Sequence, residues 1–369
     1  MTRKESLDCA PGKIAAPLLA WFADARRPLP WRLDYDPYKV WIAEVMLQQT
    51  QVETALPYFA RWMLRFPSPK AVAAARLESI LKAWEGLGYY SRARNLHRAA
   101  QAIVEYHGGK IPDDPEALKA LPGIGRYTAG AIASIAFNRA LPVVDGNVAR
   151  VLSRVFALRD AVRSPKGQRR LWSLAEQALS PRHPRDFNEA LMELGALVCR
   201  PRAPACGVCP LAGICRANAG GIPERYPRPA PRPIRPVRRG IMMLAERDGR
   251  LLVRKRPKQG LWGGLWEFPW TWVKPEGAAA ALKQLIEQAG LPDDIRTSKT
   301  GELQHGLTHF ELALTVRAGR TTSAWKANSG AWRWVSTAEL TRLPMARLSH
   351  KALALRNAGK RPSPRRKGG

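Results

Sequence analysis

The sequence has few acidic residues, few cysteines and no long apolar run. Thirty Asp and Glu oppose sixty Lys and Arg in 369 residues, so the formal net charge is +30. No apolar stretch reaches the length of a membrane span, and the N-terminal MTRKESLDCAPGK lacks the hydrophobic segment of a secretory signal. These absences argue against a membrane protein and against a secreted one. We therefore expect a soluble protein of the bacterial cytoplasm.

The excess of positive charge indicates a polyanionic partner. Like charges on a compact surface repel one another, and binding to phosphates is favoured because it releases condensed counterions. Nucleic acid is the partner that this charge predicts. The alternative is the arginine-rich composition of a GC-rich genome, with the charge spread over solvated faces. Charge alone does not decide between the two.

The length predicts two domains, and the composition changes once along the chain. Prolines alternate with arginines in ERYPRPAPRPIRPVRR, residues 224–239, which predicts a semi-rigid linker because proline fixes φ and lacks an amide donor. Residues 1–223 carry apolar residues three and four apart, as helices do. Residues 240–355 include IMMLAERDGRLLVRKR, two strands around an Asp-Gly turn, and the strand HFELALTV, so this domain is predicted to be α/β. Residues 356–369 are predicted to be a basic, disordered tail.

Four of the five cysteines lie close together, in CRPRAPACGVCPLAGIC. The gaps between Cys199, Cys206, Cys209 and Cys215 are six, two and five residues. Disulfides are disfavoured in a reducing compartment, and four clustered thiolates suit tetrahedral zinc or an iron–sulfur cluster. The softness of thiolate ligands does not choose between these metals. Cys9 stands apart and is predicted to be a free thiol.

A glycine-containing hairpin lies upstream, in LPGIGRYTAGAIASIAF. Gly123 and Gly125 allow a tight turn that presents backbone amides, and the following residues open a helix whose positive end can receive a phosphate. This pattern predicts the hairpin of a helix-hairpin-helix motif that holds the DNA backbone. The alternative is an ordinary connection between two helices.

Two carboxylates are candidate catalytic residues. Asp145, in LPVVDGNVARV, ends an apolar run before a helix, so it is predicted to be an N-cap that stays ionised and can face a developing cation. Glu44, in VWIAEVMLQQTQ, lies on an apolar helix, where desolvation raises the pKa of its carboxyl enough to exchange a proton near neutral pH. The alternative for Glu44 is a buried structural glutamate paired with an arginine such as Arg32.

Together these motifs carry a resemblance to a known family. The segments PWR, WIAEVMLQQTQV, GLGYYSRARNLH, LPGIGRYTAGA, VVDGNVARV and FNEALMELGA, with the cysteine spacing, resemble the helix-hairpin-helix DNA glycosylase superfamily. Within it, residues 14–221 are similar to MutY-type adenine DNA glycosylases that carry an iron–sulfur loop. Residues 240–355 are similar to the Nudix-like recognition domain of that family. The resemblance implies a mainly α fold with a smaller α/β domain, and a [4Fe–4S] cluster on the four cysteines.

The resemblance also implies a reaction and its catalytic residues. The reaction is monofunctional hydrolysis of the N-glycosidic bond of adenine that is mispaired with 8-oxoguanine or guanine in double-stranded DNA, a step of base excision repair. Glu44 protonates adenine at N7, Asp145 stabilises the oxocarbenium-like sugar, and Tyr127 and Asn147 orient the two carboxylates. A monomer associated with the nucleoid and not with a membrane is the expected form.

Further residues carry over from the family as contacts to the bases. Around the flipped adenine or beside 8-oxoguanine the resemblance places Trp31, Arg32, Gln49, Thr50, Leu87, Tyr89 and Glu189. In the second domain, Thr308 and His309 match the loop that reads 8-oxoguanine, with threonine in place of the more usual serine. A Thr-His pair at the start of a strand, without a recognition role, is the alternative.

Three other functions remain to be weighed. A bifunctional endonuclease III-like glycosylase/lyase carries a nucleophilic lysine in the hairpin, where this chain has Tyr127. A Nudix hydrolase needs several glutamates on one helix to hold divalent cations, but LKQLIEQAG keeps only Glu287, with Lys283, Gln284 and Gln288 at the other positions. A non-enzymatic cluster-bearing DNA-binding module has no need of both Glu44 and Asp145.

Overall fold

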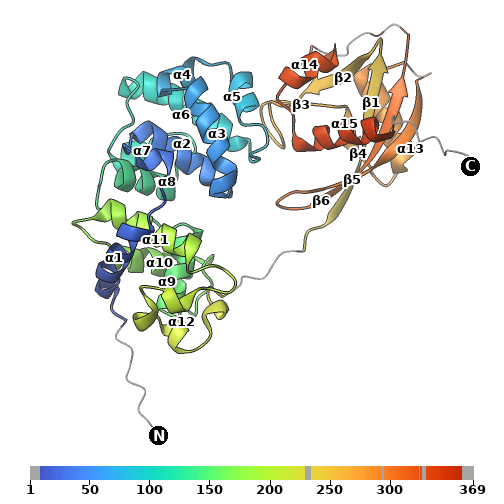
Figure 1. Ribbon diagram of the computed structural model, residues 1–369. Helices are drawn as coiled ribbons and strands as arrows, with labels where there is room; N and C mark the ends of the chain where they lie inside the picture. The colour runs from blue at the N-terminus through green and yellow to red at the C-terminus, as the bar shows by residue number, and fades with distance from the viewer. Residues whose placement is uncertain (1–8, 229–233, 293–294, 324, 326–329, 360–369) are drawn as a thin grey trace, which may run out of the picture. The chain divides into compact units, whose positions relative to one another are not determined.

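The computed structural model divides the chain into two compact units with separate cores (Figure 1). The helical unit contains Met1–Ala74 and Asn95–Arg232, and the sheet unit contains Ala75–Arg94 and Pro233–Gly369. The structure describes residues 9–228, 234–292, 295–323, 325 and 330–359.

The helical unit is built from short helices joined by tight turns. Its helices are α1 Ala15–Ala25, α2 Pro37–Leu47, α3 Val52–Arg65, α4 Pro69–Ala74, α7 Pro115–Ala120, α8 Arg126–Ala131, α9 Gly146–Val155, α10 Pro165–Ala178, α11 Pro184–Leu197 and α12 Arg216–Ala219. Helix α6, Ser91–His107, begins in the sheet unit and continues into the helical unit, and α5, Leu77–Ala83, lies in the sheet unit. Helix α8 passes directly into a π-helix at Ile132–Ala136.

Polar caps start several of these helices where the sequence provides them. Asp114, Asp145 and Ser164 each accept a hydrogen bond from the backbone N–H three residues later, which satisfies an otherwise unpaired donor. The N-cap predicted for Asp145 is therefore confirmed. The carboxylate is held at the first turn of α9 by purely local geometry.

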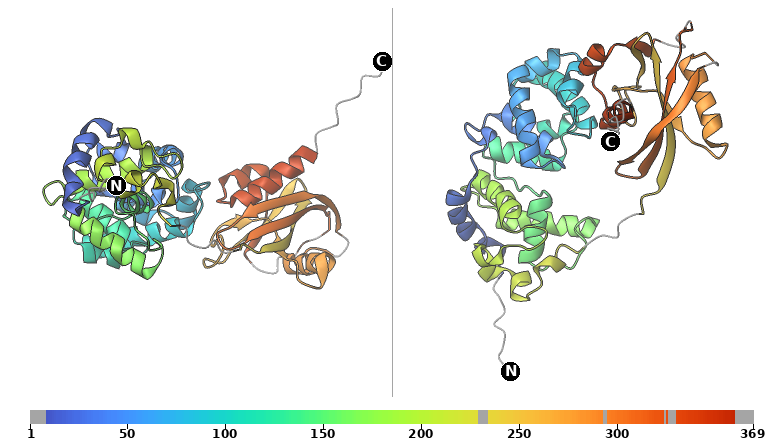
Figure 2. Two further views of the ribbon diagram at one scale, coloured as in Figure 1. Left: turned by 90° about the horizontal axis from the view of Figure 1, so that it is seen from below. Right: turned by 45° about the vertical axis from the view of Figure 1, so that its right-hand side comes forward.

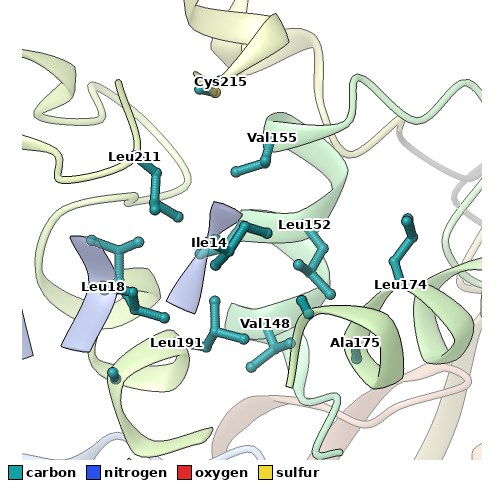
Figure 3. Close-up of a cluster of buried hydrophobic side chains, with 14 of the residues drawn as sticks. Ile14, Leu18, Val148, Leu152, Val155, Leu174, Ala175, Leu191, Leu211 and Cys215 are labelled. Carbon is teal, nitrogen blue, oxygen red and sulfur yellow. The ribbon is translucent and has the colours of Figure 1, made fainter. Parts of the chain in front are cut away.

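The core of the helical unit forms around helix α9. Val148, Leu152 and Val155 on α9 are fully buried and pack with Ile14, Leu18, Leu174, Ala175 and Leu191 (Figure 3). Leu211 and Cys215 belong to the same buried cluster, so the cysteine loop packs on the core that supports the first turn of α9.

The sheet unit has a mixed sheet with the strand order β3-β2-β1-β6-β5, in which β4 pairs with β1 and β7 with β2. β1 and β6 run parallel, whereas the other pairs are antiparallel. The strands are β1 Val237–Arg247, β2 Arg250–Lys255, β3 Trp266–Glu267, β4 Trp270–Trp272, β5 Arg296–Gly306, β6 Glu311–Arg320 and β7 Trp332–Val335. The predicted Asp248-Gly249 turn is confirmed, and both residues have the positive φ that a two-residue hairpin needs.

Helices cover both faces of this sheet, because β1 alternates its side chains between them (Figure 2). Met242 and Leu244 pack with α14, Thr337–Arg342, and α15, Arg347–Gly359. Met243 packs on the other face with α13, Gly277–Ala289. The mainly helical first part and the α/β second part predicted from the sequence are confirmed.

The predicted linker and tail differ from the structure at their edges. β1 starts at Val237, inside the segment predicted as linker, because Val237–Arg239 pair in parallel register with Glu311–Ala313. At its other end, the Tyr226 carbonyl accepts from Arg154 and Tyr226 packs on the helical core. The helix α15 continues to Gly359, past the predicted start of the tail, while residues 360–369 lie outside the described residues.

One finding concerns membranes. Within the part of the chain that the structure describes, none of the helices has the length and apolar character required to cross a bilayer.

Candidate active site and cysteine cavity

A cavity of about 890 Å³ opens in the helical unit between α2, α8, α9 and α11. Nine of the residues that the sequence predicted as site residues line it: Trp31, Arg32, Glu44, Gln49, Thr50, Tyr127, Asp145, Asn147 and Glu189. They come from positions up to 158 residues apart, between Trp31 and Glu189. The volume lies within the range of small-molecule pockets, so the cavity can hold a base.

Glu44 is a deeply buried acid of this cavity. Its side chain comes from α2, the residue is only 3% exposed, and its Oε2 accepts a 2.6 Å hydrogen bond from the Tyr127 hydroxyl. Burial raises the pKa of Glu44 to about 7; the Tyr127 hydrogen bond opposes this shift, and the charges of Asp145 and Glu189 add to it. The carboxyl therefore exchanges a proton near neutral pH, as the sequence predicted.

Asp145 faces the same cavity from the start of α9. Oδ1 accepts from the Val148 N–H at 2.7 Å, and Oδ2 accepts from the Asn147 amide at 2.9 Å. Burial raises the pKa of Asp145, while these two hydrogen bonds work against that rise. Asn147 thus orients Asp145 in the same way that Tyr127 orients Glu44.

Arg32 does not form the predicted alternative pair with Glu44. Its Nε donates to Glu189 Oε1 at 2.8 Å and its Nη2 to Glu193 Oε2 at 3.1 Å, so two acids of α11 take its donors. Glu193 also accepts from Arg27 Nε at 2.6 Å. Burial disfavours ionisation of Glu193, but the two guanidiniums outweigh it and hold its pKa below the usual value. The reading of Glu44 as an arginine-paired structural glutamate is therefore wrong.

Glu193, Arg27 and Arg150 line the cavity but were not predicted from the sequence. A signal existed for Glu193, because it lies four residues after Glu189 on one helix and so shares its face. Arg150 had none. Its Nη2 donates to Asn147 Oδ1 and its Nε to the Cys199 carbonyl, both at 2.8 Å, so it connects the cavity with the cysteine loop.

The hairpin predicted from its two glycines lies between α7 and α8. Gly123 has φ +80°, and a Cβ there lies 2.5 Å from the Asn95 Cβ, so only glycine fits. Gly125 is the extended N-cap of α8, and open space surrounds the position of its missing Cβ. Both glycines are exposed.

The four clustered cysteines surround a second cavity. Cys199, Cys206, Cys209 and Cys215 line it together with aliphatic side chains such as Leu211, and all four are free thiols. Burial and the neighbouring thiols raise the pKa of Cys209 to about 11. Four thiols this close carry mutual repulsion when ionised, which a bound cationic centre removes. The donor set and the apolar enclosure therefore fit a metal centre.

A cationic side chain, Arg154, also lines the cysteine cavity. Arg154 on α9 donates to Cys199 Sγ at 3.3 Å and to the Arg200 and Pro201 carbonyls, so it secures the start of the loop. Among the residues that the structure describes, no group of three or more His, Cys, Asp or Glu side chains is placed so that it could hold a metal ion.

Gln49 and the predicted residues outside the cavity lie in exposed turns or beside them. Gln49 follows α2 with φ +58°, and Tyr89 in the sheet unit is 46% exposed with φ +47°. Leu87, also in the sheet unit, is only 7% exposed. Thr308 and His309 are exposed in the turn between β5 and β6. The strand predicted to begin at His309 begins at Glu311, because Leu307 and Phe310 close the turn.

The comparisons with known proteins agree in both halves of the chain. Residues 42–177 match the HhH-GPD superfamily of base excision DNA repair proteins, and residues 240–355 match the NUDIX domain. The human adenine DNA glycosylase is 39% identical over 81% of this chain and 65% of its own length, and the rat one is 38% identical over 85% and 72%. This chain thus spans about two thirds of the human relative. A solved thermostable thymine-DNA glycosylase aligns with a TM-score of 0.53 and 28% identity, over 57% of this chain and 97% of its own.

Proposed function

Because the chain belongs to the adenine DNA glycosylase family, we propose that it hydrolyses the N-glycosidic bond of adenine mispaired with 8-oxoguanine or guanine in duplex DNA. The observation that carries this proposal is the pair of buried carboxylates in one cavity, each held by its own hydrogen-bond donor. Paired carboxylates in different environments divide the acid and electrostatic roles of glycoside hydrolysis. An enzyme with this substrate works on the chromosome, so a nucleoid-associated, cytoplasmic bacterial monomer is part of the proposal.

The reaction begins with the adenine rotated out of the stack into the cavity, since its reactive atoms are shielded inside a duplex. Glu44, protonated near neutral pH, donates its proton to adenine N7 and makes the base a better leaving group. The resulting carboxylate then accepts a proton from the attacking water. Asp145 stabilises the positive charge that develops on the sugar, and Asn147 keeps its carboxylate in place.

Tyr127 accounts for the proposed monofunctional outcome. A lyase needs an amine at this point to form a Schiff base with the sugar carbon, and a phenol cannot form one. The Tyr127 hydroxyl is moreover engaged with Glu44, and its pKa is raised by burial and by that carboxylate, so it stays protonated. The expected product is free adenine and an intact strand with an abasic site.

The DNA contacts in the proposal rest on exposure and backbone shape. The amides around Gly123 and Gly125 bind a phosphate, and Gln49 and Tyr89, each exposed in a left-handed conformation, enter the duplex beside the mispair. Thr50, which lines the active-site cavity, contacts the base opposite the adenine. Leu87 is proposed to lie beside the same base.

The recognition of 8-oxoguanine by Thr308 and His309 is tested together with the activity. The wild-type protein is expected to release adenine faster from a duplex with 8-oxoguanine opposite it than from one with guanine. The double variant Thr308→Ala/His309→Ala should still release adenine, but its preference for 8-oxoguanine should fall roughly 10-fold, since two polar contacts are lost. Single-turnover excision on both duplexes measures this.

The control for this prediction is Thr341→Ala, an exposed threonine of α14 whose hydroxyl donates only to the Ala338 carbonyl. An unchanged preference in the double variant contradicts the recognition role. If the wild type releases no adenine from either duplex, the proposed activity itself is wrong. Strand cleavage without alkali contradicts the monofunctional outcome.

For the cysteine cavity we propose a [4Fe–4S] cluster held by Cys199, Cys206, Cys209 and Cys215. The four cysteine thiolates would hold such a cluster, which would tie the two ends of this loop together. Supporting it are the apolar enclosure and the four cysteines that line this one cavity. Zinc is the alternative, because it also accepts four thiolates.

Metal analysis of the purified protein separates the two. We expect a brown protein with broad absorption near 400 nm, about four iron and four sulfide per chain, and loss of this colour in Cys206→Ser. Cys9→Ser, at the cysteine that lies outside the cavity, should keep the full iron content. A colourless protein with one zinc per chain contradicts the cluster.

A further inference from the structure

One residue behind the active-site cavity fixes an acid that lines it. The Tyr35 hydroxyl donates to Glu189 Oε2 at 2.8 Å, while Arg32 Nε donates to Oε1 of the same carboxylate at 2.8 Å. Glu189 is only 2% exposed and lines the cavity, whereas Tyr35 does not line it. The hydrogen bond to Glu189 therefore connects Tyr35 with the cavity.

Tyr35 is itself held firmly in this position. Two guanidiniums lie over its ring, that of Arg26 at 5.4 Å and that of Arg185 at 4.0 Å from the ring centroid. Arg26 Nη2 also donates to the Tyr35 hydroxyl. Arg185 is anchored in turn, because it donates to the Ile135 and Ala136 carbonyls of the π-helix.

The backbone at Tyr35 is unusual for a bulky residue. Its φ of +52° lies in the left-handed region that aromatic residues seldom adopt, and it occurs one residue before Asp36, the N-cap of α2. Backbone conformations of this kind persist where surrounding contacts enforce them, and they concentrate at functional sites. The turn brings the Tyr35 hydroxyl to Glu189 of α11.

The hydrogen-bonding groups of Tyr35 and Glu189 define which bases the pair can distinguish. Burial and the neighbouring Glu189 charge raise the pKa of Tyr35, so the phenol stays protonated and donates. An ionised carboxylate has about four lone-pair sites, and Arg32 and Tyr35 occupy one on each oxygen. The remaining sites accept a donor that enters the cavity. The exocyclic amine of adenine is such a donor, and unsubstituted purine has none at that position.

We propose that Tyr35 is a positioning residue of the adenine pocket, which holds Glu189 as a fixed acceptor for the exocyclic amine and so sets the preference for adenine over purines without it. This rests on the proposed function. If the Glu189 carboxylate is not held in place, the pocket loses its preference for adenine. A mobile acceptor makes no well-oriented hydrogen bond with the exocyclic amine.

The test compares adenine and unsubstituted purine, each placed opposite 8-oxoguanine in the same duplex, by single-turnover excision. In Tyr35→Phe the ratio of the two rates should fall roughly 10-fold, because the phenylalanine keeps the stacked ring and loses only the donor. Tyr106→Phe, at an exposed tyrosine outside the cavity, should leave the ratio unchanged. Equal losses on both bases, or no loss, overturn the proposal.

A double-mutant cycle identifies the route of the effect. In the Glu189→Gln background, Tyr35→Phe should no longer change the ratio, since both act through one carboxylate. A persisting effect overturns the assignment. If Tyr35→Phe does not fold, as judged by its melting curve, Arg185→Lys is measured instead, and the ratio should fall about threefold through loss of the stacked guanidinium; an unchanged ratio overturns the proposal. A wild type that excises neither base refutes the proposed function, and this inference with it.

Discussion

Glu44→Gln is expected to reduce adenine excision roughly 10³-fold while leaving DNA affinity within a factor of about two. The amide keeps the shape of the side chain and can still accept the Tyr127 hydrogen bond, but it cannot transfer a proton to N7. Single-turnover rates on a duplex with adenine opposite 8-oxoguanine measure the loss. Glu105→Gln, at an exposed glutamate of α6 outside the cavity, should keep the wild-type rate.

We also expect Glu44→Gln to raise the free energy of unfolding at high pH. Since burial raises the pKa of Glu44 from 4.5 to about 7, the folded protein keeps its proton between these values while the unfolded chain loses it. Stability contributed by this group is therefore complete below pH 4.5 and declines as the pH rises to about 7. Glu44→Gln should be about 3 kcal/mol more stable than wild type at pH 8, with little difference at pH 4.

The pH profile of excision follows from the same ionisation. The wild-type rate should fall as the pH rises through about 7, because the acid form of Glu44 disappears. Denaturant unfolding at pH 4 and 8, together with excision rates from pH 5 to 9, checks both effects. A Glu44→Gln protein that excises adenine at near wild-type rate would falsify the acid role, and equal stability at pH 8 contradicts the burial argument.

Asp145→Asn is expected to lower excision by roughly 10³-fold with less than about 1 kcal/mol change in stability. Asparagine is as good an N-cap as aspartate, so its side-chain oxygen can still accept from the Val148 N–H. What disappears is the negative charge that faces the developing cation of the sugar. The measurement is the single-turnover rate beside the free energy of unfolding.

A matched cap elsewhere in the helical unit controls for helix effects. Asp114 caps α7 through the Ala117 N–H, is exposed, and does not line the cavity. Asp114→Asn makes the identical chemical change and should leave excision unaltered. If Asp145→Asn retains wild-type activity, or if Asp114→Asn loses as much, charge at the sugar is not the cause.

Local patterns in the sequence were sufficient for several parts of the site. Asp145 could be recognised as an N-cap because its hydrogen-bond partner is only three residues away. The Asp248-Gly249 turn could be recognised because its positive φ angles fall on those two adjacent residues. The apolar neighbours of Glu44 on one helix were enough to predict its raised pKa. These properties depend on a few adjacent residues, so a linear pattern contains them.

Other parts depended on pairs of residues that are distant in the chain. Nothing near Arg32 indicated that Glu189 and Glu193, rather than Glu44, take its donors. Val237 became a strand residue instead of linker because it pairs with Glu311 of β6, and no local signal precedes that pairing. Leu87 matched a DNA-contacting motif, yet the surrounding side chains bury it.

The sequence by itself therefore determined the fold class, the Asp145 cap, the raised pKa of Glu44 and the spacing of the four cysteines. Only the tertiary structure decided which charges neutralise one another and which donors reach the cavity. Tyr35 and Glu189 are 154 residues apart, and their hydrogen bond exists because the turn before α2 packs against α11. Hydrogen bonds and ion pairs extend over about 3 Å, so they specify contacts only after hydrophobic packing has brought distant segments together.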